Sequence, residues 1–216
     1  MNTQDNFVIT INRELGSGGR TVGAILARKL NVPYYDKLLI QALEKKYQLD
    51  IEEIERLKGQ KKSWWEDFAR MVKPFVDASQ ENFLMHTIGE EVGEGAATPE
   101  NVFKAEKEIL HGIADAGSSI IAGRSAFYVL KDHPNKLSVL IQAPLEQRIA
   151  RVMEKQKLPR QKAIETIERV DKMRETYVQR FTGTSRYDTR NYDIVLNMNG
   201  LSEEEAADLI LKYIKI

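Results

Sequence analysis

A glycine-rich loop between an apolar run and a helical pattern constrains the fold of this chain more than any other feature. The run Phe7–Ile11 is typical of a short strand, and Arg20–Leu30 carries apolar residues at helical spacing. Between them, three of the four residues 16–19 are glycines, which is more than a tight turn needs. Glycine readily adopts positive φ, so successive N–H groups can point at one anion, and the helix N-terminus adds further donors. The loop therefore predicts a phosphate site formed by Gly16, Ser17, Gly18, Gly19, Arg20 and Thr21.

The loop matches the P-loop pattern G-x-x-x-x-G-K-[ST] imperfectly, because no alignment supplies the lysine. In one alignment residues 19–21 stand for G-K-T, and Glu14 then occupies the position of the first glycine. In the other alignment residues 16–21 match the G-x-G-K-G-T ending of nucleoside monophosphate kinases, and Gly19 occupies the lysine position. Phosphoryl transfer at this loop would therefore need a cation from elsewhere in the chain.

Two arginines beside the loop are candidates for this cation. Arg20 follows the lysine position at the helix N-terminus, so we predict that it contacts the β- and γ-phosphates. Arg13, on the other side of the loop, is the second candidate. The structural alternative is that Arg20 points outward from the first helical turn and pairs with an acidic neighbour.

Four further apolar runs, separated by helical patterns, indicate the fold class. They are short, rich in valine and isoleucine, and do not alternate cleanly, as expected for strands covered on both faces. We assign strands to residues 32–35, 119–122, 137–141 and 192–196. A helix is expected over Pro144–Gln156, and residues 202–205 form a capping box that opens a last helix. Strands alternating with helices predict one α/β domain over residues 1–216, with a mostly parallel sheet of about five strands.

The middle of the chain has helical periodicity and no convincing strand, so we expect a helical insert at about 45–116. It holds several large aromatic residues, among them Trp64, Trp65, Phe68, Phe75 and Phe83. That aromatic density exceeds what a thin helical layer readily hides, and exposed apolar patches usually mark interaction surfaces. We therefore predict that the insert forms the subunit contact of a homodimer.

Composition excludes several classes of function. The 32 Lys and Arg residues balance 32 Asp and Glu residues, so no overall positive charge recruits nucleic acid. The absence of cysteine removes disulfides, thiol catalysis and cysteine-based metal sites. The chain starts without a signal-peptide pattern, and no apolar run approaches the roughly 18–20 residues that span a bilayer. We expect a cytoplasmic protein with neither a nucleic-acid partner nor a membrane partner.

Five segments, in order along the chain, resemble the cytidylate kinase-like family, a group of P-loop proteins related to bacterial cytidylate kinase. They are residues 11–20, 32–37, 122–125, 143–151 and 191–197. The resemblance implies a three-layer, P-loop kinase-like fold and an ATP-dependent phosphotransferase that uses Mg²⁺. Its reaction would transfer the γ-phosphate of ATP to CMP or a related small acceptor. Because the loop lysine is missing, a non-catalytic nucleotide-binding regulatory protein with a degenerate P-loop is the alternative.

The resemblance also implies residues of the acceptor side. Gly123-Arg124 follows a strand and resembles the family's Gly-Arg-Asp, whose Arg and Asp hold the monophosphate substrate, but Ser125 stands in place of that Asp. Asp36 follows another strand at the same sheet edge, where ligands of open α/β sheets bind. We expect it to bind a substrate hydroxyl or, with Thr21, a Mg²⁺ ion, since oxygen ligands suit that ion. An N-cap for the next helix is the alternative role of Asp36.

An arginine-rich helical region at about 148–190 completes the predicted site as a mobile lid. In the family, arginines of this region close over the transferring phosphate. The catalytic residues implied are Arg20, Arg124, Arg148, Arg151 and Arg174, and the substrate contacts implied are Asp36, Arg124, Ser125, Arg169 and Asp171. The alternative for each single arginine is a solvated, charged helix face, which most arginine-rich helices present.

Overall fold

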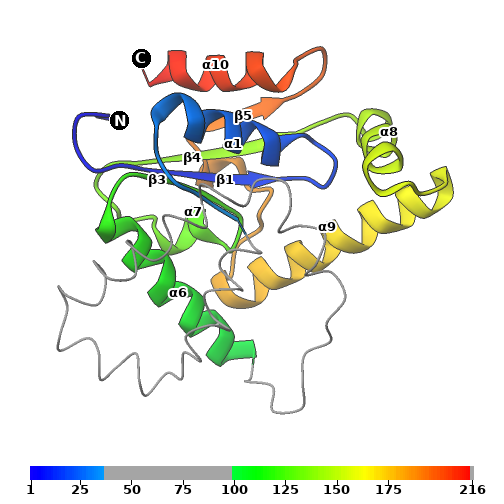
Figure 1. Ribbon diagram of the computed structural model, residues 1–216. Coiled ribbons are helices and arrows are strands. Elements are labelled where there is room, and N and C mark those ends of the chain that lie inside the picture. Colours follow the sequence, from blue (N-terminus) through cyan, green and yellow to red (C-terminus); the bar gives the residue numbers. More distant parts are fainter. Residues whose placement is uncertain (37–98, 215–216) are drawn as a thin grey trace.

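Residues 1–36 and 99–214 are described by the computed structural model, and a sheet of five parallel strands forms their centre (Figure 1). In chain order the strands are β1 (Val8–Arg13), β2 (Tyr34–Tyr35), β3 (Ser119–Ala122), β4 (Lys136–Gln142) and β5 (Ile194–Asn197). Their order across the sheet is β2-β3-β1-β4-β5, and every neighbouring pair is parallel. Each strand lies on one of the five runs expected from the sequence, which confirms the α/β class and the parallel sheet.

Helices cover both faces of the sheet and complete the three layers of the fold (Figure 1). One face is covered by α1 (Gly19–Leu30) and α10 (Glu203–Tyr213), the other by α6 (Pro99–Ala116) and the short α7 (Ala126–Val129). The buried side chains of the first layer include Ile9, Ile11, Val22, Leu26, Val139 and Ile210. Those of the second layer include Val8, Ile109, Leu110, Ile121 and Leu130. The successive residues of β1 thus alternate between the two cores, as a strand requires.

The edge strand β5 differs from the other strands in its burial. Ile194 and Leu196 pack toward α1 and α10, whereas Val195 remains 40% exposed. The expectation of strands covered on both faces is therefore wrong for β5, since within residues 1–36 and 99–214 only one of its faces packs against a helical layer.

The helices of the first layer begin at the signals present in the sequence. Gly18 is the N-cap of α1 with φ 86°, and Asn31 ends the helix in the left-handed region. At α10 the predicted capping box is present: the Glu205 N–H donates to Ser202 Oγ at 3.2 Å. The Ser202 N–H donates back to the Glu205 carboxylate at 2.8 Å. The glycine loop therefore leads directly into the N-terminus of α1.

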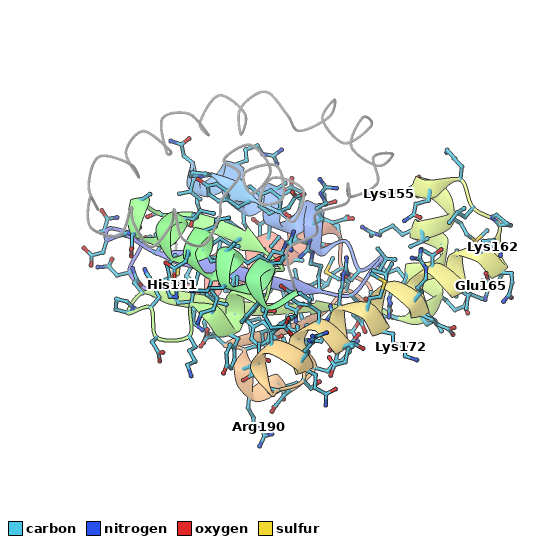
Figure 2. All side chains as sticks on the ribbon, turned by 90° about the horizontal axis from the view of Figure 1, so that it is seen from below. His111, Lys155, Lys162, Glu165, Lys172 and Arg190 are labelled. Atoms are coloured by element: carbon cyan, nitrogen blue, oxygen red, sulfur yellow. The ribbon has the colours of Figure 1, made fainter. Side chains whose placement is uncertain are left out.

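After β4, α8 (Leu145–Gln156) and α9 (Arg160–Thr182) form a helical pair at the carboxyl end of the sheet (Figure 1). Lys157 ends α8 in the left-handed region, and α9 begins after Pro159. The two helices share a small core of Ile149, Val152, Ala163 and Ile167. The outward side of α9 is a solvated, charged face on which Lys162, Glu165 and Lys172 point away from the protein (Figure 2). The inward side of the same helix faces the loop.

An aromatic cluster joins the far end of α9 to α6. The Phe103 ring centroid lies 4.7 Å from that of Phe181 and 6.1 Å from that of Tyr177. The Tyr177 hydroxyl also donates to the fully buried Glu106 carboxylate at 2.5 Å. α9 is thus anchored by α8 at one end and by α6 at the other.

The helical insert predicted at about 45–116 is described only in its last part, which is α6. Residues 37–98, with their tryptophans, lie outside the described residues. The predicted subunit contact of the insert therefore stays a prediction, which sedimentation equilibrium of the purified chain checks.

Candidate phosphate-binding site

The loop between β1 and α1 has the backbone conformation that its glycines predict. Gly16 and Gly18 have φ 82° and 86°, in the left-handed region that favours glycine. Both residues also lie against α8. A Cβ on Gly16 would lie 2.7 Å from the Arg148 carbonyl oxygen, and a Cβ on Gly18 would lie 2.6 Å from Arg151 Nη1. The positive φ therefore favours glycine at both positions, and close packing against the α8 backbone adds to this at Gly16.

The N–H groups of the loop divide into two sets. The Ser17 N–H donates to the Glu14 carbonyl at 3.3 Å, and the Gly19 N–H lies 3.4 Å from Ser17 Oγ. The N–H groups of the second set, at Gly16, Gly18, Arg20 and Thr21, form no hydrogen bond with any described residue. The last two belong to the first turn of α1, where the helix dipole places partial positive charge. These four donors are available to a bound phosphate.

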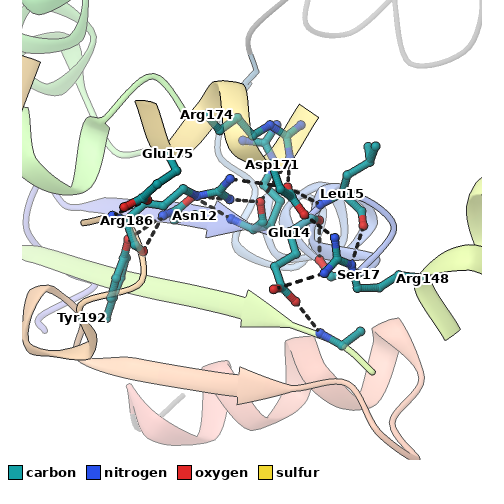
Figure 3. Close-up of polar contacts among 12 residues, drawn as sticks. Asn12, Glu14, Leu15, Ser17, Arg148, Asp171, Arg174, Glu175, Arg186 and Tyr192 are labelled. Carbon is teal, nitrogen blue, oxygen red and sulfur yellow. Dashed lines mark hydrogen bonds and ion pairs between the residues drawn. The ribbon is translucent and has the colours of Figure 1, made fainter. Parts of the chain in front are cut away.

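A buried ion-pair network holds the loop in place (Figure 3). Arg148 of α8 donates through Nε to the Leu15 carbonyl at 2.8 Å, and it pairs with Glu14 at 3.2 Å and with Asp171 of α9. Asp171 Oδ1 accepts the Leu15 N–H at 3.1 Å. Glu14 also accepts the Ala143 N–H at 3.1 Å, which ties the loop to the end of β4. In the alignment that places Glu14 at the first P-loop glycine, the network gives this acidic residue a role: Glu14 anchors the loop.

Arg186 completes this network, although no pattern in the sequence singled it out (Figure 3). Its side chain is only 1% exposed. It donates to Asn12 Oδ1 at 3.2 Å, pairs with Asp171 Oδ1 at 3.4 Å and also donates to the Arg13 carbonyl. Its own carbonyl oxygen accepts the Tyr192 hydroxyl at 2.7 Å. Arg186 stands in a charged segment, where nothing in the sequence indicates that one arginine is buried.

The arginines near the loop are crowded enough to perturb one another. Arg174 Nη1 lies 3.3 Å from the Arg13 carbonyl oxygen and 3.5 Å from Asp171 Oδ1. Burial, followed by the charges of Arg13 and Arg186, lowers the pKa of the Arg174 guanidinium to about 10. Several guanidinium groups thus share one carboxylate, and an anion at this place would relieve their repulsion.

Arg20 pairs with an acidic neighbour, which is one feature of the structural alternative for this residue. Its Nη2 lies 2.7 Å from Asp36 Oδ2, and its side chain is 46% exposed. Asp36 is itself buried at the end of β2. The two predicted site residues therefore pair with each other, and the role of Arg20 as the lysine substitute stays a prediction.

The carboxyl end of β3 carries the predicted acceptor residues on an unusual backbone. Gly123, Arg124 and Ser125 have φ 89°, 56° and 55°, and two left-handed non-glycine residues in succession are uncommon. Arg124 is buried and forms an ion pair with Glu106 of α6. Ser125 Oγ is buried and has no hydrogen-bond partner in the described part of the chain. Backbone strain held at the ligand-binding edge of a parallel sheet is typical of a functional turn.

Of the two remaining predicted site residues, Arg151 lies at the glycine loop and Arg169 does not. The Arg151 guanidinium lies over Gly18 and pairs with Glu203 of α10. Arg169 is exposed on α9 and has no ion pair or side-chain hydrogen bond within the described ranges. The structure therefore places Arg151 beside the loop and Arg169 in solvent.

Neither a metal cluster nor a membrane span occurs in the part of the chain that the structure describes. Within residues 1–36 and 99–214, no cluster of three or more acidic or histidine side chains could hold a metal ion. In the same ranges, no helix combines the length and the apolar character needed to cross a membrane.

The parallel sheet, the glycine loop after its first strand and the surrounding arginines define a protein of the P-loop kinase type. Comparison with known proteins identifies the family within this class. The chain belongs to the cytidylate kinase-like family, whose model matches residues 8–200. This confirms the resemblance and supports a kinase-type enzyme, while leaving the acceptor open.

Solved structures show the same fold. An uncharacterized protein from Eubacterium ventriosum has a TM-score of 0.68 at 24% identity, over 96% of this chain and 98% of that chain. Shikimate kinase from Bacteroides thetaiotaomicron has a TM-score of 0.51 at 14% identity, over 97% of this chain and 99% of that chain. At these identities the likeness concerns the fold alone.

One curated relative matches part of the sequence. A protein named uronate isomerase from Corynebacterium glutamicum is 29% identical over 106 residues, which are 49% of this chain and 20% of that protein. The chain therefore spans about a fifth of the length of the curated relative it matches.

Proposed function

We propose that this protein is an ATP-dependent phosphotransferase that moves the γ-phosphate of ATP to CMP or a related small acceptor. The observation that carries the proposal is the loop itself. The N–H groups of Gly16, Gly18, Arg20 and Thr21, in the loop and the first turn of α1, form no hydrogen bond with any described residue. Family membership supplies the reaction class.

Phosphoryl transfer suits such a site because it depends mainly on positioning and on positive charge around the phosphate. The loop N–H groups would hold the phosphates of ATP, and Arg151 and Arg174 would add charge from α8 and α9. Mg²⁺, when bound, would neutralise phosphate oxygens, with Thr21 and Asp36 as its oxygen ligands. The cytoplasm, where such nucleotides occur, is the location that this proposal implies.

Two residues expected to contact substrates are better suited to a positioning role. Arg148 and Asp171 form an ion pair with each other, Arg148 also pairs with Glu14, and both form hydrogen bonds with the backbone of Leu15. They fix the loop in the conformation that frees its N–H groups. Asp36, Arg124 and Ser125 remain the proposed acceptor side, at the ends of β2 and β3.

A coupled assay for ADP release, with ATP, Mg²⁺ and a panel of nucleoside monophosphates and small hydroxylated metabolites, tests the proposal. We expect turnover with CMP or a related acceptor. Gly16→Ala should weaken ATP binding at least tenfold, because the new Cβ would lie 2.7 Å from a backbone oxygen of α8. Gly200→Ala is the matched control: Gly200 has a similar φ of 74°, but a Cβ there would meet no atom within 4 Å. Equal ATP affinity in the two variants would contradict the assignment of the loop.

A non-catalytic nucleotide-binding protein is the second candidate, and one observation favours it. In the alignment with the G-x-G-K-G-T ending, Gly19 occupies the lysine position, and a Cβ there would lie 2.7 Å from Arg13 Cβ, so the packing leaves no space for a lysine. ATP binding without turnover of any acceptor in the panel would support this candidate over the first.

A further inference from the structure

The side chain of Arg13 fills the space in which a P-loop lysine would begin. A Cβ on Gly19 would lie 2.7 Å from Arg13 Cβ and 3.2 Å from Arg13 Cγ. Arg13 is the last residue of β1, at the middle of the sheet, and Gly19 is the first residue of α1. Glycine at position 19 and arginine at position 13 are therefore two parts of one packing arrangement.

The Arg13 guanidinium points from this stem toward the acceptor side of the site. Its Nη1 lies against Gly123, where a Cβ would collide with it. In the described part of the chain the guanidinium makes no hydrogen bond and no ion pair, although the residue is half-buried. Burial is the largest cause and lowers the pKa of Arg13; the nearby Tyr34 and Asp36 raise it, and the charges of Arg186 and Arg20 lower it. A half-buried guanidinium that forms no direct ion pair costs stability, and a bound anion would offset that cost.

A second polar group beside Arg13 also lacks a partner. The Tyr34 hydroxyl is buried and makes no hydrogen bond with any described residue. Its ring packs on α1, where a Cβ on Gly23 would lie 2.6 Å from Tyr34 Cε2. The Arg13 charge lies close enough to act on the Tyr34 phenol, whose pKa burial raises to about 12. A guanidinium and a hydroxyl, each without a partner among the described residues, thus occupy one place between the loop and β3.

We propose that Arg13 binds the phosphate group held over the loop and takes the place of the missing P-loop lysine. This inference rests on the proposed function. In the transfer, an acceptor oxygen bonds to the γ-phosphorus while the bond from that phosphorus to the bridging oxygen breaks, and the electron pair stays with ADP. Arg13 exchanges no proton and forms no covalent bond; it neutralises charge on the transferring group. Its position between Gly19 and Gly123 faces both the ATP side and the acceptor side.

Thermal unfolding with inorganic tripolyphosphate tests the binding role without requiring an acceptor. Arg13→Met keeps an unbranched stem beside Gly19 and removes the charge, Arg13→Lys restores the charge, and Arg28→Met is the control. Arg28 is an exposed arginine on α1 that pairs with Glu204 at 2.8 Å, away from the loop. We expect tripolyphosphate to raise the Tm of the wild type and of Arg28→Met. Arg13→Met should bind the anion at least tenfold more weakly, and Arg13→Lys should lie between them.

Two further readouts separate this role from a structural one. Without anion, Arg13→Met should be at least as stable as the wild type, because an unpaired buried charge is removed. With an acceptor from the panel, its kcat should fall about a hundredfold, as for loss of one transition-state contact. Tripolyphosphate affinity of Arg13→Met within twofold of Arg28→Met would overturn the inference, and so would an unchanged Tm of the wild type. A third outcome is that tripolyphosphate raises the Tm only when Arg13 is present while no acceptor in the panel is turned over. That result would refute the proposed function, but Arg13 would still be the ligand of the anion.

Discussion

Asp171→Asn is the substitution that tests the buried network most directly. The Asp171 side chain is 11% exposed and faces Arg148, Arg174 and Arg186, of which Arg186 is 1% exposed. Asparagine has the same shape and keeps an oxygen for the Leu15 N–H, but it removes the charge that these arginines share. Removing one partner of a buried ion pair costs about 3–5 kcal/mol, because the other charge is left uncompensated. We expect a loss of that size in the free energy of unfolding.

Asp208→Asn is the matched control, because Asp208 pairs with Lys29 on the surface and is 62% exposed. Exposed pairs contribute about 1 kcal/mol or less. Urea unfolding of both variants, followed by circular dichroism, gives the two free energies, and an unchanged m-value shows that the same surface is exposed. We expect the free energy of unfolding to fall more in Asp171→Asn than in Asp208→Asn. A difference between the two losses smaller than about 1 kcal/mol would refute the account of the network.

Two further predictions follow from packing and from burial. Gly19→Lys alone should weaken tripolyphosphate binding, because the new Cβ would lie 2.7 Å from Arg13 Cβ. When Arg13→Ala removes that clash, Gly19→Lys should instead strengthen tripolyphosphate binding relative to Arg13→Ala alone. A double-mutant cycle measures this coupling, and additive effects would count against it. Burial raises the pKa of Tyr35 from its ordinary 10 to about 12, so the folded state keeps the phenol proton more tightly than the unfolded state. Stability should be unaffected below pH 10 and should fall as the pH rises above it, with phenolate absorbance appearing together with unfolding.

The elements that the sequence predicted well are those specified by nearby residues. The apolar runs marked all five strands, and the capping box at Ser202 marked the start of α10 within one residue. The loop was recognisable because strand, glycines and helix N-terminus follow one another directly. Each of these signals needs only about ten consecutive residues, so no knowledge of the tertiary contacts is required.

The pairing of the charged residues was not predictable in the same way. Glu14, Arg148 and Arg186 are far apart in the sequence and meet only because β1, α8 and the segment before β5 converge. A sequence rich in arginine and glutamate offers many equivalent pairings, and only the fold selects among them. For the same reason the ion pair between Arg20 and Asp36, at 2.7 Å, was not predictable from the position of Arg20 alone.

The backbone of Arg13 connects the proposed cation to the network that holds the loop. The Arg13 carbonyl accepts hydrogen bonds from Arg174 and Arg186, and both of these arginines pair with Asp171. A cation on the strand is thus fixed by α9 and the segment after it, whereas a lysine on the first turn of α1 would be fixed by the helix alone. Loss of the Asp171 charge should therefore disturb the loop and the Arg13 guanidinium together, and it should weaken tripolyphosphate binding as well as stability. Arg13→Met should weaken binding alone, because it leaves the carbonyl and every ion pair of Asp171 in place.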